Sequence, residues 1–174
     1  SLADIEHALV VGSAAQRAFR DDIARMGKTA LAAIRQRGGR GIVLAGRPYH
    51  GDPEIGHGIA SLLRECGFAV LTEDMLLFAE GPLEAEALNL SGWLYSDRVL
   101  NAAQATIAFD NLEFMELYSF GCGLDALTVD RAREIIEGNG KVFTALKIDE
   151  MVDLASIRIR VRSMIAAHER RSFE

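Results

Sequence analysis

The stretch Gly-Ile-Val-Leu-Ala-Gly at residues 41–46 decides how the rest of the chain is interpreted. A short apolar run between glycines is typical of a parallel strand buried on both faces. Similar runs lie at 68–71, 114–120 and 141–148, and helical spacing marks 13–37, 55–66, 93–109, 125–137 and 155–171. Residues 106–109 would also suit a strand, and 72–92 resemble a loop with a short helix. The alternation predicts a three-layer α/β domain. Its sheet would be doubly wound and mainly parallel, with about four strands. The pattern does not determine the strand order, and the order 2-1-3-4 is expected by analogy with flavodoxin-like folds.

Length and composition narrow the class of protein. The 174 residues suit one α/β domain, in which residues 1–40 form an N-terminal helical segment. Because the chain begins inside helix-like sequence, we expect it to be an excised fragment of a larger multidomain protein. The net charge of −6 argues against a nucleic-acid partner. No run reaches a bilayer-spanning length and no signal peptide is apparent, so we expect a cytoplasmic location without membrane contact. The two cysteines, Cys66 and Cys122, are expected to be reduced.

The first candidate site is the loop at residues 46–58, GRPYHGDPEIGHG, between the first strand and a helix. Asp52 is a plausible N-cap with Pro53 at the first helical position. A guanidinium beside a helix N-terminus suits a phosphate or a carboxylate. The alternative is that these side chains bond to loop backbone and hold its shape. Neither a Walker loop nor a GxGxxG motif is present. The candidate ligand-binding residues here are Gly46, Arg47, Tyr49, His50 and His57.

The second candidate site is the stretch SFGCGLD at residues 119–125, between the third strand and a helix. Gly121 and Gly123 flank Cys122 and would let the backbone approach a ligand closely, and Asp125 follows. A thiol at a helix N-terminus is favoured as the thiolate, which nucleophiles and metal ligands need. Three interpretations stay open: a buried inert cysteine, a nucleophile, or an iron–sulfur ligand whose partner cysteines lie outside this chain. The phosphatase pattern C-x5-R is absent, because position 128 is threonine.

Charged residues after the other strands suggest weaker sites. Glu73 and Asp74 follow the second strand and could hold a base or a cation, although solvation or helix capping is the favoured interpretation. Asp149 and Glu150 follow the fourth strand and receive the same interpretation. In the arginine-rich run at 158–162, a surface role is favoured over a substrate site.

Several of these motifs resemble one family. GIVLAGRPYHGDPEIGHGI (41–59) and GFAVLTED (67–74) are similar to a region of CoA-substrate-specific enzyme activases, also called 2-hydroxyglutaryl-CoA dehydratase activator-related proteins. SFGCGLDALTVDRAREIIEGNGKVFTALKIDE (119–150) and ASIRIRVRSMIAAHE (155–169) resemble the same family, so the similarity spans about residues 40–170. Two departures are the glycine at position 56, where the family often has a larger polar residue, and the lack of the activase ATPase motifs.

The layout is also similar to the last domain of 2-hydroxyacyl-CoA dehydratase and benzoyl-CoA reductase subunits. Those subunits hold [4Fe–4S] clusters through cysteines of different domains. The resemblance therefore implies that Cys122 is one cluster ligand in the full-length protein, in an anaerobic electron-transfer system that is coupled to ATP hydrolysis and acts on a CoA thioester. It implies other domains of the parent protein, or dehydratase subunits, as partners.

Three hypotheses about function follow. In the first, Cys122 binds an iron–sulfur cluster and the loop of Arg47 and His50 holds an acyl-CoA or another anion. In the second, the chain is a non-catalytic module that binds a partner or acyl-CoA without a cluster. In the third, it is a cysteine-dependent hydrolase, which requires a base near the thiolate. We expect the isolated chain to be inactive and without cofactor. All three hypotheses need the loops of Arg47 and Cys122 to converge at one edge of the sheet.

Overall fold

A computed structural model describes residues 1–79, 92–119, 121, 123–148 and 154–171. Its centre is a four-stranded, wholly parallel sheet in the order β2-β1-β3-β4, which confirms the predicted fold and strand order. Gly41 of β1 is in register with Ala69 of β2 and Leu112 of β3. The strands are β1 (Arg40–Ala45), β2 (Phe68–Thr72), β3 (Leu112–Tyr118) and β4 (Phe143–Lys147).

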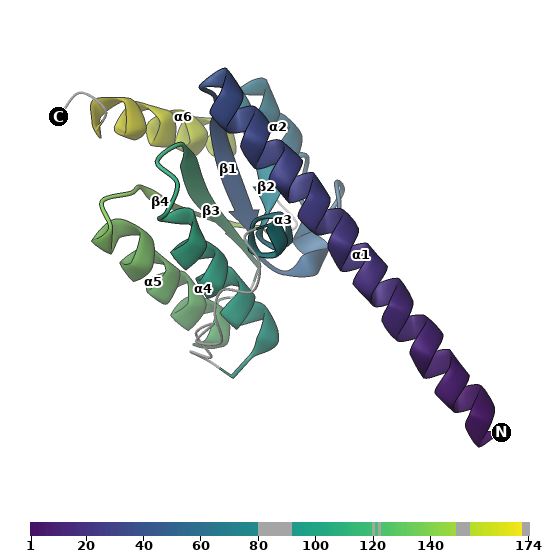
Figure 1. Ribbon diagram of the computed structural model, residues 1–174. Coiled ribbons are helices and arrows are strands. Elements are labelled where there is room, and N and C mark those ends of the chain that lie inside the picture. The colour runs from purple at the N-terminus through teal and green to yellow at the C-terminus, as the bar shows by residue number, and fades with distance from the viewer. Residues whose placement is uncertain (80–91, 120, 122, 149–153, 172–174) are drawn as a thin grey trace.

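Helices cover both faces of the sheet (Figure 1). One apolar core lies under α1, α3, α4 and α5, and alternate residues of β1, Val43 and Ala45, point into it. Ile42 points to the opposite face, where the second core lies under α2 and α6. Both faces of the strands are therefore buried, as the continuous apolar run predicted. The helices are α1 (Leu2–Arg37), η1 (Pro48–Gly51, 3-10), α2 (Ile59–Glu65), α3 (Glu73–Ala79), α4 (Leu94–Thr106), α5 (Gly123–Gly138) and α6 (Leu154–Arg171).

Some predicted boundaries shift, for local reasons. The helix expected from residue 55 begins only at Ile59, because His57 and Gly58 adopt left-handed backbone angles, with φ of 47° and 70°. Asp52 instead caps the turn before it, where its Oδ1 accepts hydrogen bonds from the N–H groups of Glu54 and Ile55 at 2.9 and 3.2 Å.

The ends of α4 and β3 also differ from expectation. The alternative strand at 106–109 is wrong: α4 continues to Thr106, whose hydroxyl donates to the Ala102 carbonyl at 2.7 Å, and a turn follows. β3 begins at Leu112, two residues before the predicted start, and residue 120 lies outside the described residues. The core-facing strand residues were nonetheless found by their apolarity.

The first helix is much longer than the sheet needs, and its amino-terminal half projects from the body (Figure 1). Every residue of 1–22 is exposed, whereas Gly27, Leu31 and Ile34 are buried against the body. Gly27 lies where α1 crosses α3: a Cβ there would come 2.0 Å from the Met75 carbonyl oxygen. Within the described ranges, no helix combines the length and apolarity required to cross a bilayer.

Candidate functional site

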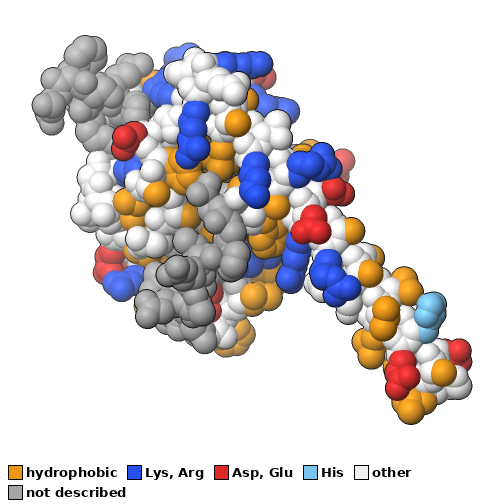
Figure 2. Space-filling view, in the orientation of Figure 1, with side chains coloured by type: hydrophobic (Ala, Val, Ile, Leu, Met, Phe, Trp, Pro, Cys, Tyr) orange, Lys and Arg blue, Asp and Glu red, His pale blue; other side chains and the backbone are white. Residues whose placement is uncertain are grey.

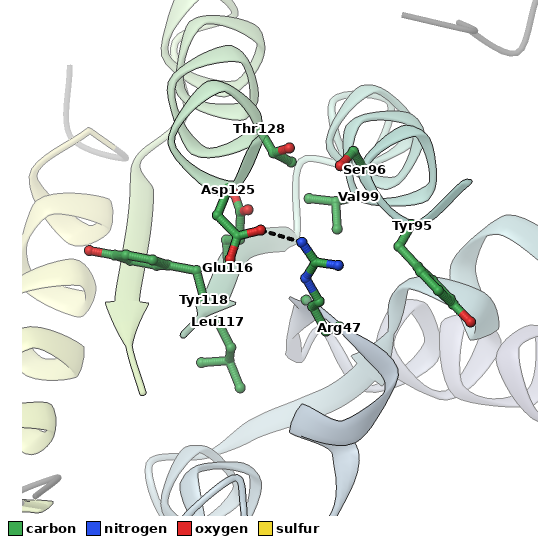
Figure 3. A pocket seen from close by; sticks show the side chains of 10 residues that line it. Arg47, Tyr95, Ser96, Val99, Glu116, Leu117, Tyr118, Asp125 and Thr128 are labelled. Atoms are coloured by element: carbon green, nitrogen blue, oxygen red, sulfur yellow. Dashed lines mark hydrogen bonds and ion pairs between the residues drawn. The ribbon is translucent and has the colours of Figure 1, made fainter. Parts of the chain in front are cut away.

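Two loops meet at the carboxyl end of β1 and β3, which we call the rim. The Arg47 guanidinium, just after β1, forms an ion pair with the Asp125 carboxylate in the first turn of α5 (Figure 3). Asp125 is buried and Arg47 is half-buried. Because parallel neighbours end at the same edge, residues 78 positions apart come into contact. The convergence expected from the sequence is therefore present in the residues flanking position 122.

His50 forms the second link between these loops. Its Nδ1 accepts a hydrogen bond from the Arg47 backbone N–H at 3.1 Å, so in the neutral ring the proton lies on Nε2. Nε2 then donates to Ser119 Oγ at 2.7 Å. Burial lowers the pKa of His50, and the Arg47 charge acts in the same direction, although Asp125 opposes them. His50 is thus a neutral structural link with both ring nitrogens engaged.

Two glycines allow this loop to pack tightly. A Cβ at Gly46 would come 2.7 Å from both His50 Nδ1 and the Leu117 carbonyl oxygen. A Cβ at Gly56 would come 2.6 Å from the His50 carbonyl oxygen. Real Cβ contacts are not this short, so a larger side chain at either position requires the loop to shift. Glycine at position 56 therefore has a packing reason in this chain.

The other two candidates on this loop lie apart from the Arg47–Asp125 pair. Tyr49 is 38 % exposed and packs edge-on against His50, with ring centroids 4.6 Å apart. His57 is half-buried on the left-handed turn before α2. Neither side chain lines the cavity described below.

The acids after β2 do not have the solvated environment favoured from the sequence. They begin α3, which fits a helix-start role, but Glu73 is buried and Asp74 is ion-paired with Arg98 of α4. The Arg98 guanidinium also lies 3.7 Å from Glu73. Burial raises the pKa of Glu73 to about 7, and Asp74 adds to the rise. The expectation of solvation is wrong for Glu73, because α4 packs against the start of α3 and brings Arg98 beside this carboxyl group.

Glu116 of β3 is a rim residue that the sequence analysis missed. It is 3 % exposed, and within the described part of the chain its Oε2 has no hydrogen-bond partner. Figure 3 shows its carboxyl group beside that of Asp125. Burial raises the pKa of Glu116 to about 8, and the Asp125 charge adds to the rise. The signal was available: Glu116 continues the alternation of Leu112 and Phe114, so it had to face the core.

A cavity of about 600 Å³ opens beside the rim. Its floor is formed by the ends of β1 and β2, and its sides by the loop after β1, by α2 and by residues of α1, α3 and α4. The lining is mixed, with Arg47, Arg98, Glu73 and Asp74 among apolar side chains. The apolar members are Phe19, Ile23, Leu44, Ile59, Val70 and Leu117. A second, water-sized space of about 20 Å³ lies between Arg47, Asp125 and Glu116.

Of the two cysteines, the structure describes Cys66 and not Cys122. Cys122 lies outside the described residues, as do Asp149 and Glu150. The two glycines on either side of Cys122, Gly121 and Gly123, are exposed, and Gly123 begins α5. Cys66 is half-buried at the end of α2 and packs against the second core. Among the described side chains, no group of three or more His, Cys, Asp or Glu is placed to hold a metal ion.

Comparison with known protein families gives a match to part of the chain. Residues 1–76 match the family model described as the CoA enzyme activase uncharacterised domain (DUF2229). This confirms the resemblance to CoA enzyme activases over those residues, which include the loop of Arg47 and His50. No curated protein matches the chain, and no solved structure does.

Proposed function

We propose that this chain, a CoA enzyme activase-related α/β domain over its first 76 residues, supplies Cys122 as one ligand of an iron–sulfur cluster that it shares with cysteines from elsewhere. The observation that supports the proposal is the pair of contacts at the rim. His50 binds Ser119 on one side of Cys122, and Arg47 binds Asp125 on the other. The loop that matches the activase family therefore holds both flanks of the cysteine.

The number of cysteines limits how many cluster ligands the chain can supply. A [4Fe–4S] cluster takes four thiolates as a rule, and the chain has two cysteines. Cys66 packs against the core under α2, so it is assigned a structural role. One ligand from this chain and the others from enzyme subunits or further domains is the arrangement that fits. When bound, such a cluster supplies one-electron chemistry. The residues of this chain would hold the loop and set its local charge.

The charged groups at the rim give the surroundings of Cys122 a net charge close to zero. The Arg47 charge is balanced by Asp125, His50 is neutral, and the raised pKa of Glu116 favours its protonated form at neutral pH. Arg47 is then chiefly a residue that positions the start of α5. We propose this positioning role for Arg47 instead of the direct binding of an anion.

Iron content tests the cluster proposal. The protein that carries this chain is purified anaerobically as wild type, Cys122→Ala and Cys66→Ala. We expect Cys122→Ala to lose most of its iron and its visible absorption. The matched control, Cys66→Ala, should keep both, because Cys66 packs against the second core. Equal iron per chain in wild type and Cys122→Ala, with all proteins folded by circular dichroism, would exclude Cys122 as a ligand.

The cavity beside the rim supports a second candidate, the binding of an acyl-CoA. Its volume of about 600 Å³ is within the range of small-molecule sites, and its apolar lining suits an acyl or pantetheine chain. His50, by contrast, offers little support for a cysteine hydrolase, because both its ring nitrogens already have partners.

Calorimetry with CoA esters checks this second candidate. We expect saturable binding that Arg47→Ala weakens about tenfold, since Arg47 lines the cavity and orders the loop. Cys122→Ala should bind like the wild type. Arg158→Ala is the control, because that arginine is exposed and pairs with Glu65 on the other face. No heat of binding at millimolar ester would rule this candidate out and leave the cluster proposal standing.

A further inference from the structure

The projecting half of α1 carries an exposed apolar stripe. Leu2, Ile5, Leu9 and Phe19 are 73, 59, 66 and 62 % exposed, and Met26 extends the line at 51 %. Their spacing alternates three and four residues when Gly12, Gln16 and Ile23 are included. This is the a/d spacing of a coiled-coil seam. Figure 2 shows orange side chains along the projecting helix.

No element of the described chain covers the stripe over residues 1–18. Residues 1–18 are all exposed, which amounts to about five turns of helix. Beyond them α1 reaches the body: Phe19 lines the cavity beside the rim, and the Arg20 guanidinium lies 6.0 Å from the centre of the Phe78 ring. In proteins, most of the stability of a helix comes from the packing of its apolar face against another element. Gly27, Leu31 and Ile34 of α1 are buried against the body. The seam meets the body at its carboxyl-terminal end, where Ile23 is half-buried and lines the cavity. A stable α1 therefore calls for a partner along the stripe.

We propose that the partner is a second copy of this chain, with the two α1 helices packed antiparallel about a two-fold axis near residue 14. In that register Leu2 faces the partner's Met26, Ile5 faces the partner's Ile23, and Leu9 faces the partner's Phe19. Every apolar seam residue then meets an apolar one. Such a contact is isologous and closes as a dimer.

Charge supports the same register. When Leu2 is assigned to heptad position a and Ile5 to position d, the residue after each d position is an e position and flanks the seam on one side. Two of these e positions are charged, Glu6 and Arg20, and they lie two heptads apart. In an antiparallel pair, e positions face e positions, so Glu6 lies beside the partner's Arg20 at both ends of the contact. In a parallel pair the two residues would be about 21 Å apart along the axis and could not meet. The central layer places Gly12 opposite the larger, polar Gln16, and a polar seam residue of that kind fixes register.

Sedimentation equilibrium of the 174-residue chain over a concentration series tests the proposal. We expect a monomer–dimer equilibrium whose dissociation constant rises at least about 30-fold in Leu9→Glu, because a charge enters the seam. Val10→Glu is the matched control: Val10 is also 66 % exposed but lies off the seam, so this variant should dimerise like the wild type. A wild type that stays monomeric to millimolar concentration would overturn the proposal, as would equal effects of the two substitutions.

A charge swap tests the register. Glu6→Arg should weaken the dimer, and adding Arg20→Glu should restore it. Circular dichroism of each variant checks that α1 remains helical. If the double variant is no tighter than Glu6→Arg alone, the antiparallel register is wrong.

Discussion

Replacing Gly27 with alanine is expected to destabilise the fold by about 3 kcal/mol or more, a large effect for the addition of one methyl group. The new Cβ would lie 2.0 Å from the Met75 carbonyl oxygen and 2.8 Å from its carbonyl carbon. Both atoms belong to the backbone of α3, so no flexible side chain can move aside. The two helices must separate, and the core around Leu31 and Ala79 must then open. Urea denaturation gives the change in unfolding free energy.

Gly12 in the same helix is the control for this prediction. A Cβ at Gly12 meets nothing within 4 Å, and alanine has the higher helix propensity, so Gly12→Ala should be neutral or slightly stabilising. The measurement is made at a concentration low enough to keep the chain monomeric. If both variants unfold at the same urea concentration as the wild type, α1 does not cross α3 as closely as described.

Replacing Glu116 with glutamine is expected to stabilise the protein increasingly as the pH rises from about 5 to 8. The pKa of Glu116 is about 8 in the fold, against about 4.3 in an unfolded chain, so the folded state keeps a proton that the unfolded state has released. Stability of the wild type therefore falls with rising pH in this window, by about 1.4 kcal/mol per pH unit for this group. Glutamine mimics the protonated carboxyl and removes that slope. The gain at pH 8 is on the order of 3–5 kcal/mol.

Unfolding curves at pH 5, 6.5 and 8 check this. Glu73 contributes a slope of the same sign up to about pH 7, and it remains in both proteins, so it cancels in the comparison. Glu137→Gln, at an exposed position of α5, is the control and should leave stability unchanged at every pH. Curves of wild type and Glu116→Gln that differ by a constant amount across this range would show that Glu116 is ionised in the fold.

The local sequence pattern was enough to predict the sheet and part of the rim. The apolar runs around Val43, Leu71 and Phe114 have to be buried, and parallel strands joined by helices place their carboxyl ends together. The rim position of Arg47 and Asp125 could therefore be predicted. Their ion pair could not, because the sequence does not say which of several charged side chains at one edge will meet.

The two buried glutamates, Glu73 and Glu116, also differ in how far the sequence indicates their burial. Glu73 was expected to be solvated or to cap a helix, and its burial results from the packing of α4, which brings Arg98 beside it. Glu116 was overlooked inside an apolar strand, although its period-two position already indicated burial.

The sequence by itself determined the α/β class, the buried strands and the two loops that form the rim, because these depend on apolar periodicity and on the handedness of crossover connections. The strand order was expected only by analogy with flavodoxin-like folds, and the structure has that order. Only the tertiary structure decided which charges pair, which acids lose their water, and where α1 leaves the body. Those outcomes depend on contacts between residues tens of positions apart, such as Arg47 with Asp125 and Gly27 with Met75, and no local pattern encodes them.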